Sequence, residues 1–336
     1  MCNAFYAAKV CHEQVQTFLA SSPTNSLYSL KSTFDNDNNP VSNLHNKLHL
    51  PTLYPPSFNA TLHQSAQNQV LRSYNDFLSV LNHWNLEQLS ISYNGGKDCL
   101  VQLIIYLAAI YQFVEVEGKG SEREPHTIHV NAVYVHTENE FEDQLRFLEK
   151  SVLQYGLDFT AVYTTIDAND YDSSQILTGK ANELSKGKIT CLFSPTPTLP
   201  CGFLTYLKSN ESVEAIVVGI RRTDPYGASL KLEQRTDTHR GWPDFMRINP
   251  ILGWHTSDVW YFIKWLQHAS INTDFAVDYC SLYDDGYTSL GGCDNTVRNP
   301  QLKRKDSGKK DILFWPAWWI LDDDIERLSR VQKGKV

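Results

Sequence analysis

The sequence predicts an α/β fold in which a doubly wound, mostly parallel sheet is covered by helices. Two observations predict it. Short β-rich runs alternate with helix-length apolar segments between residues 89 and 270, which is the spacing of βαβ crossovers. One run, residues 215–220 (A-I-V-V-G-I), is apolar apart from one glycine, as strands buried on both faces are.

Each expected element follows from its pattern of apolar residues. Helices favour apolar residues three or four apart, and strands favour β-branched and aromatic runs. The expected strands are residues 89–93, 127–136, 158–164, 215–220 and 245–252. The expected helices are residues 64–84, 100–113, 140–155 with Gly156 as its stop, 173–185, 201–209 and a helix from Ser257.

Composition excludes several classes of protein. A net charge of -8 argues against an extended nucleic-acid surface. Seven cysteines without a C-x-x-C pair fit reduced thiols and give no zinc spacing. No apolar run approaches the roughly 18 residues of a membrane span, and the start resembles neither a secretory signal nor a transit peptide. We therefore expect a cytoplasmic protein without nucleic-acid or membrane partners. We also predict a monomer.

A glycine-rich turn, S-Y-N-G-G-K-D-C at residues 92–99, lies between the first expected strand and its helix. Gly95 and Gly96 allow unusual backbone angles and a close ligand approach. A helix that begins here aims free N–H groups and its positive end at the same point, where Lys97 adds a cation. The turn therefore predicts a site for a phosphate-bearing ligand.

The residues of this turn also occur in two other kinds of structure. Asn-Gly is common in β-hairpins, but the apolar segment after it is long for a strand and suits a buried helix. A Walker A loop is excluded, because Ile91 and Asp98 occupy the positions where that motif needs Gly and Ser or Thr. We therefore predict a modified P-loop.

Charged residues follow the strand at residues 215–220. The run G-I-R-R-T-D-P-Y places Gly219, Arg221, Arg222 and Asp224 at the end of that strand. The carboxyl ends of parallel strands share one sheet edge, where ligands of such folds bind. A solvated charged turn is the alternative to a ligand site at this position.

A second pair of cations lies near the end of the sequence. Arg327 and Arg330 stand three residues apart in E-R-L-S-R, so a helix would place them on one face. Such a pair could clamp a phosphate, and a solvated tail is the alternative.

Together these segments resemble the eukaryotic, fungal-type single-domain FAD synthetases, the FMN adenylyltransferases of the phosphoadenylyl sulfate reductase-like family. The resemblance rests on the two runs described above, on W-P-D-F, on Y-T-S-L-G and on E-R-L-S-R, in the family's order. It covers about residues 66–330. It implies an adenine nucleotide alpha-hydrolase-like, Rossmann-like fold. The expected organisation is an N-terminal extension (1–65), an ATP- and FMN-binding domain (66–300) and a C-terminal segment (301–336) that completes the site.

The resemblance also implies roles for individual residues. Asp98 and Asp224 would work beside the triphosphate and its Mg²⁺, Arg327 and Arg330 would help to bind phosphate, and Asn94 could steady the α-phosphate. Asp237 and Trp242 would lie beside the flavin ring. The residues implied to bind ATP or FMN elsewhere are Ser92, Tyr93, Asn94, Gly95, Gly96, Lys97, Cys99, Gly219, Arg221 and Arg222.

The implied reaction transfers AMP from MgATP to FMN and gives FAD and pyrophosphate. Two enzyme alternatives use the same fold. A sulfonucleotide reductase wants a nucleophilic cysteine in an E-C-G-x-H type segment, which this sequence lacks. A tRNA-modifying ATP pyrophosphatase fits poorly with the acidic balance and the missing C-x-x-C. A nucleotide-binding regulator without turnover is the non-enzyme alternative.

Overall fold

The core of the protein is one seven-stranded sheet. The computed structural model describes residues 3–23, 58–116, 118, 128–136, 139–164, 188–303 and 314–331. The strand order is β4-β3-β2-β1-β5-β7-β6, and every neighbouring pair is parallel except β6 and β7. The strands are β1 Leu89–Ser92, β2 Asn131–His136, β3 Asp158–Thr164, β4 Lys188–Ser194, β5 Ala215–Val217, β6 Glu233–Arg235 and β7 Met246–Ile248. The predicted mostly parallel α/β fold is confirmed.

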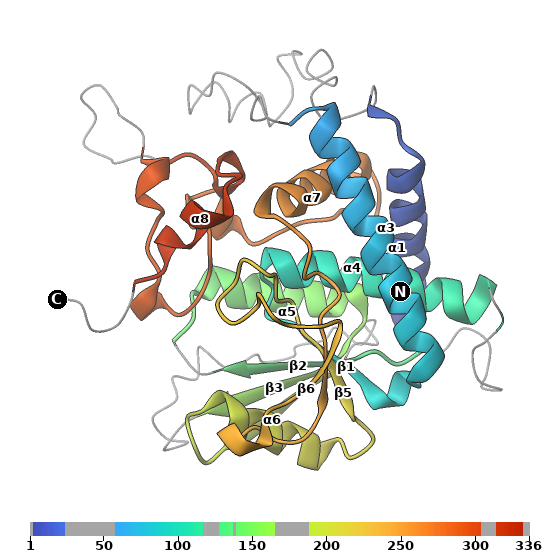
Figure 1. Ribbon diagram of the computed structural model, residues 1–336, viewed down its shortest axis with the longest axis vertical. Coiled ribbons are helices and arrows are strands. Elements are labelled where there is room, and N and C mark those ends of the chain that lie inside the picture. The colour runs from blue at the N-terminus through green and yellow to red at the C-terminus, as the bar shows by residue number, and fades with distance from the viewer. Residues whose placement is uncertain are drawn as a thin grey trace.

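Helices cover both faces of the sheet (Figure 1). One face carries α6 Leu199–Ser209, and the other carries α4 Lys97–Tyr111 and α5 Glu142–Tyr155. Three further helices pack around α4 in an outer layer, namely α1 Ala4–Ala20, α3 Ala60–His83 and α7 Thr256–Ser270. The short helix α8, Asp323–Glu326, belongs to the C-terminal segment.

Helix α4 is the centre of the larger core because nearly every side chain along it from Leu100 to Ile110 is apolar and buried. The stretch Lys97–Val116 is long and apolar enough by composition to cross a membrane, and it is the one such helix in the described part of the chain. The expectation that no such stretch exists was wrong. Contacts with α1, α3 and α7 give this composition its reason, since a helix enclosed by protein needs apolar residues all round.

The sheet winds in two directions from its middle. From β1 the strand order runs outward to β4, and from β5 it runs outward to β7 and β6. β1 and β5 pair in parallel, with Leu89 opposite Ala215 and Ile91 opposite Val217. The loops after these two strands therefore leave at the point where the winding reverses, which is where open α/β sheets bind ligands.

Several element boundaries differ from the prediction. Strand β5 ends at Val217 and β7 ends at Ile248, and the last backbone hydrogen bond between them runs from the Val218 N–H to the Ile248 carbonyl at 2.8 Å. Strands β4 and β6 were not predicted. The helix expected at residues 173–185 lies outside the described residues.

The N-terminal boundary also differs. Helix α3 begins at Ala60, since the Asn59 side chain accepts a hydrogen bond from the Leu62 N–H at 3.0 Å, so the expected boundary at residue 65 falls inside a helix. Helix α1 packs against α4 in the same core, so it is an integral part of the domain.

Candidate functional site

The glycine turn joins β1 to α4 as predicted. Gly95 has a φ of 74°, and Gly96 is the residue that precedes the first turn of α4. The Asn94 side-chain oxygen accepts the Gly96 N–H at 2.9 Å, and the Tyr283 hydroxyl accepts the Lys97 N–H at 3.0 Å. Two of the N–H donors expected to face a phosphate are therefore already held by protein oxygens.

Lys97 is buried at the start of α4, with 2% of its surface exposed. Its ammonium contacts Asp98 Oδ2 at 2.8 Å and also Glu326 Oε1. Burial alone would lower the pKa of Lys97, but Asp98 and Glu326 outweigh it and raise that pKa above its ordinary value. The cation predicted at the turn is thus buried and has two counter-ions.

Arg221 is the centre of the charged network. It follows β5 and is buried, and its guanidinium contacts four carboxylates from three parts of the chain. Burial alone would lower the pKa of Arg221, but these carboxylates outweigh it and raise that pKa. The four contacts are Asp98 Oδ1 at 3.1 Å from Nε, Asp224 Oδ1 at 3.6 Å from Nη2, Asp323 Oδ1 at 3.0 Å from Nη1 and Glu326 Oε2 at 2.5 Å from Nη2.

Asp98 and Asp224 lie at the ends of neighbouring strands. Burial would raise the pKa of Asp98, but Arg221 and Lys97 outweigh it and hold that pKa below its ordinary value. Asp224 Oδ2 accepts the Arg221 N–H at 2.9 Å, and Asp224 Oδ1 lies 3.2 Å from the Arg327 guanidinium. The structure therefore brings the two predicted metal-binding carboxylates to one guanidinium.

The C-terminal arginines are arranged differently from the prediction. α8 ends at Glu326, a single 3-10 turn covers Arg327–Ser329, and Arg330 has an extended backbone. Arg330 Nη1 donates to the Leu290 carbonyl at 2.6 Å. The expectation that one helix carries both arginines was wrong, because α8 ends at Glu326, before Arg327 and Arg330.

Arg222 does not join the network. Its Nη1 donates to the carbonyls of Ala228 and Leu230 at 3.0 and 3.1 Å, so it fixes the loop that carries Asp224. A direct ligand contact by Arg222 stays a prediction beside this supporting position.

Three other predicted ligand residues have packing roles in the structure. The buried Tyr93 hydroxyl donates to Ser151 Oγ at 2.9 Å, which turns it away from the turn's exposed side. A Cβ on Gly219 would lie 3.0 Å from Cys99 Sγ, so this glycine allows β5 and α4 to approach closely. Burial raises the pKa of the Cys99 thiol to about 12, which leaves it unreactive. Ser92 ends β1, half-buried beside the turn.

Asp237 and Trp242 lie on the connection between β6 and β7. Asp237 Oδ2 pairs with Arg240 Nε at 3.1 Å near the surface, and the half-buried Trp242 ring packs 6.1 Å from that of Phe203 on α6. Within the described residues neither side chain forms a hydrogen bond or ion pair with the glycine turn. Their predicted position beside a flavin stays a prediction.

Several residues of the network were missed by sequence reasoning. Glu326 and Asp323 belong to an acidic stretch that is typical of a solvated helix start. Tyr283 and His255 belong to no recognisable motif. Asp323 Oδ2 pairs with His255 Nδ1 at 2.6 Å, and its Oδ1 accepts the Thr256 N–H at 2.8 Å. The one available signal was the glutamate that opens E-R-L-S-R, directly before the first predicted arginine.

Two carboxylates are a small set for a metal ion. No group of three or more His, Cys, Asp or Glu side chains is arranged to hold a metal among the described residues. Mg²⁺, however, is commonly bound by one or two carboxylates together with substrate phosphates and water. Asp98 and Asp224 fit that requirement.

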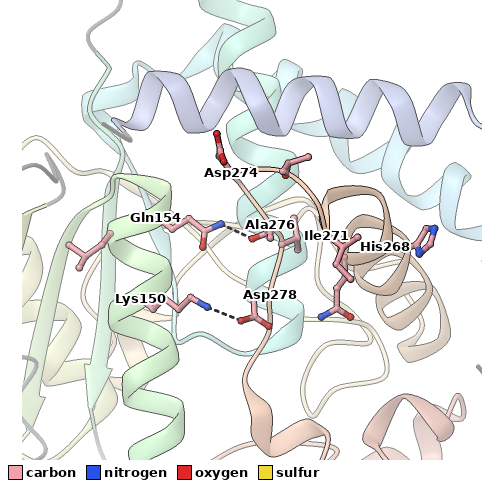
Figure 2. A pocket seen from close by; sticks show the side chains of 11 residues that line it. Lys150, Gln154, His268, Ile271, Asp274, Ala276 and Asp278 are labelled. Atoms are coloured by element: carbon pink, nitrogen blue, oxygen red, sulfur yellow. Dashed lines mark hydrogen bonds and ion pairs between the residues drawn. The ribbon is translucent and has the colours of Figure 1, made fainter. Parts of the chain in front are cut away.

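A cavity lies away from the predicted site, between α5 and the segment that follows α7 (Figure 2). Its volume is about 790 Å³. Lys150 pairs with Asp278 at 2.8 Å and Gln154 donates to the Ala276 carbonyl at 2.9 Å across it. None of the described residues that line it belongs to the predicted site.

Comparison with known proteins gives consistent matches. Residues 88–298 match the phosphoadenosine phosphosulfate reductase domain. The chain is 32% identical over 246 residues to a probable FAD synthase of Schizosaccharomyces pombe, covering 73% of this chain and 72% of that protein. It is 25% identical over 330 residues to the flavin adenine dinucleotide synthase of Saccharomyces cerevisiae, covering 82% and 95%.

Solved structures share the fold. The Candida glabrata FMN adenylyltransferase in complex with FAD and pyrophosphate matches with a TM-score of 0.70 and 22% identity over 99% of both chains. The same enzyme with FMN and the ATP analogue AMPCPP gives a TM-score of 0.68 and 21% identity over 98% of this chain and 97% of that one. A match over 99% of this chain extends beyond the segment that the sequence resemblance covered, because it takes in the N-terminal region.

Proposed function

We propose, because the chain belongs to the phosphoadenosine phosphosulfate reductase domain family and within it to the FAD synthases, that it transfers AMP from ATP to FMN. The products are FAD and pyrophosphate. The observation that carries this function is the meeting of the glycine turn after β1, the Arg221–Asp224 turn after β5 and the C-terminal segment at one charged edge. That edge lies where the winding of the sheet reverses.

The reaction needs positioning more than proton transfer. An oxygen of the FMN phosphate attacks the α-phosphorus of ATP, the bond to the β-phosphate oxygen breaks, and pyrophosphate leaves with that electron pair. The FMN phosphate is already ionised at neutral pH, so no general base is required. Holding two anions in line and neutralising their charge is the main task of such a site.

The residues at the edge suit these tasks. Arg327 is 40% exposed at its side chain and reaches Asp224, so its guanidinium can face both the solvent and a phosphate. Asn94 is placed at the turn, where its Oδ1 accepts the Gly96 N–H and its Nδ2 could donate to the α-phosphate. Asp98 and Asp224 would hold Mg²⁺, which screens the charge of the polyphosphate when bound.

A reductase function has less support. It would need a reactive thiol, and burial raises the pKa of both Cys99 and Cys280 to about 12. A cytoplasmic location and a monomeric state stay predictions from the sequence, to be checked by fluorescent tagging and by gel filtration.

Incubating the purified protein with FMN and MgATP, followed by HPLC, tests the proposal. We expect FAD and pyrophosphate to appear in equal amounts and only when both substrates are present. A nucleotide-binding regulator would instead show ATP-dependent thermal stabilisation without pyrophosphate, and that outcome would overturn the proposed activity. Adding EDTA should stop the reaction if the divalent cation is needed.

A further inference from the structure

The ammonium of Lys97 is enclosed by carboxylates. It lies 2.8 Å from Asp98 Oδ2 and contacts Glu326 Oε1, and 2% of the residue is exposed. A lysine that binds a polyphosphate directly must present at least part of its ammonium to the ligand. The position of Lys97 does not meet that requirement.

Hydrogen bonds hold both the side chain and the backbone of Glu326. Its Oε2 accepts from Arg221 Nη2 at 2.5 Å, while its backbone carbonyl accepts from Thr288 Oγ1 at 2.5 Å. The residue is buried at 2% exposure, so its charge is compensated by two cations and not by water. Moving this carboxylate away would leave both Lys97 and Arg221 short of a counter-ion in a buried position, which is costly.

Carboxylates outnumber basic side chains among the residues of this charged edge. Lys97, Arg221 and Arg327 face the carboxylates of Asp98, Asp224, Asp323 and Glu326. An arrangement with more carboxylates than cations suits a ligand that arrives as a metal–phosphate complex. It does not suit a site in which Lys97 is kept free for the phosphate.

We propose that Glu326 is a positioning residue that keeps Lys97 as an internal counter-ion, so that Lys97 orders Asp98 and the C-terminal segment and does not itself contact the polyphosphate. This inference rests on the proposed function, since it assigns roles within the same ATP site. It leaves the polyphosphate charge to the divalent cation and to the exposed guanidinium of Arg327.

A double-mutant cycle separates this role from direct contact. The variants are Lys97→Met, Glu326→Gln and the two combined, which keep side-chain size while removing one charge or an opposite pair. We expect each single variant to raise the KM for MgATP about tenfold or more. The double variant should return to within about threefold of the wild type, because the removed charges balance each other and Arg221 still holds Asp98. If Lys97 binds phosphate directly, the double variant will be as impaired as Lys97→Met, and the inference falls.

Further variants test whether Glu326 acts through its charge or only through its size. Glu326→Asp keeps the charge and should retain more MgATP affinity than Glu326→Gln, which a purely steric role would not predict. Lys264→Met, the matched control in the other buried lysine, should leave the KM for MgATP unchanged. If a single variant fails to fold, the charge-balanced double variant alone decides the question.

Failure of the proposed function is distinguishable from failure of the inference. Titration calorimetry with MgATP reports affinity without turnover. A wild type that binds MgATP but makes no FAD would refute the activity, while the cycle of binding constants would still test the pairing of Lys97 with Glu326. Equal losses in Lys97→Met and in the double variant would refute the pairing even if FAD is made.

Discussion

Two buried lysines lie in very different surroundings. Lys97 is 2% exposed and contacts Asp98 and Glu326, whereas Lys264, 8% exposed, donates to Gln267 and to the Tyr279 hydroxyl and lies about 5 Å from the rings of Tyr279 and Trp318. Burial lowers the pKa of Lys264 to about 8, although nearby Asp284 acts in the opposite direction. The pKa of Lys97 is raised in spite of its burial.

The contrast is sharper because both lysines stand beside one aromatic cluster. Trp260 packs against Tyr279 at 5.5 Å and against Tyr283 at 5.0 Å, and each tyrosine contacts one of the lysines. Two buried ammonium groups, those of Lys97 and Lys264, thus have pKa values shifted in opposite directions. Carboxylates in direct contact stabilise the charge of Lys97, whereas Asp284 and Asp278 offset the desolvation of Lys264 only in part.

The largest expected effect on stability comes from removing the ammonium of Lys97, which contacts two carboxylates. Lys97→Met should lower the free energy of unfolding by about 3–5 kcal/mol, because it leaves buried carboxylates with one cation fewer. Lys264→Met should lower it by less than about 2 kcal/mol, since it removes a charge that burial already disfavours. Urea titrations of both variants measure the difference, and equal losses would contradict the comparison.

Asp224 belongs to the same charged network, and its side chain is partly exposed. Removing it should affect catalysis more than folding. Asp224→Ala should reduce FAD formation at least about 100-fold, because it removes a carboxylate at the reacting edge. The circular dichroism spectrum should stay that of the wild type. Asp244→Ala, which breaks an exposed pair with Arg235, is the control, and near-normal FAD production by Asp224→Ala would remove Asp224 from the reaction.

The lysine in the aromatic surroundings should make stability depend on pH. Its pKa is about 8 in the folded protein and 10.5 in the unfolded chain. Between these values the unfolded chain holds a proton that the folded protein has released, so raising the pH stabilises the fold. The unfolding free energy of the wild type minus that of Lys264→Met should rise by up to about 1.4 kcal/mol per pH unit in this window. A flat difference would contradict the lowered pKa.

The smallest effect is expected where charges are solvated. Asp237 and Arg240 form an ion pair at 3.1 Å, much like those of the network, but their side chains are 47% and 79% exposed. Arg240→Ala should change the free energy of unfolding by less than about 0.5 kcal/mol. A loss above about 1 kcal/mol in a urea titration would show that this pair is more than a surface contact.

Sequence patterns were sufficient for most of the sheet and for the two turns that follow β1 and β5. β3 matches its expected range, residues 158–164, because its apolar β-rich run is bounded by a glycine-ended helix. β6 carries charged residues and pairs at the sheet edge, so no apolar pattern marked it. The turns at Gly95 and Arg221 were found because they directly follow strands.

Side-chain partners were beyond the reach of the sequence. Lys97 and Arg221 were expected to face a ligand, yet each is buried against carboxylates that come from far along the chain. Glu326 lies 229 residues after Lys97, and no local pattern links them. The contacts of Arg222 with the carbonyls of Ala228 and Leu230 depend on the backbone path of residues 223–230, which no local pattern predicted either.

The pairing of Lys97 with Glu326 also has a consequence for the growing chain on the ribosome. At about 5–20 residues per second, the 229 residues that separate them take roughly 10–50 s to synthesise. During that interval the start of α4 holds a cation that lacks one of its permanent partners, so this end of the helix should stay hydrated while the rest packs. The proposed nucleotide site would therefore lose its water only after the C-terminal segment has been made.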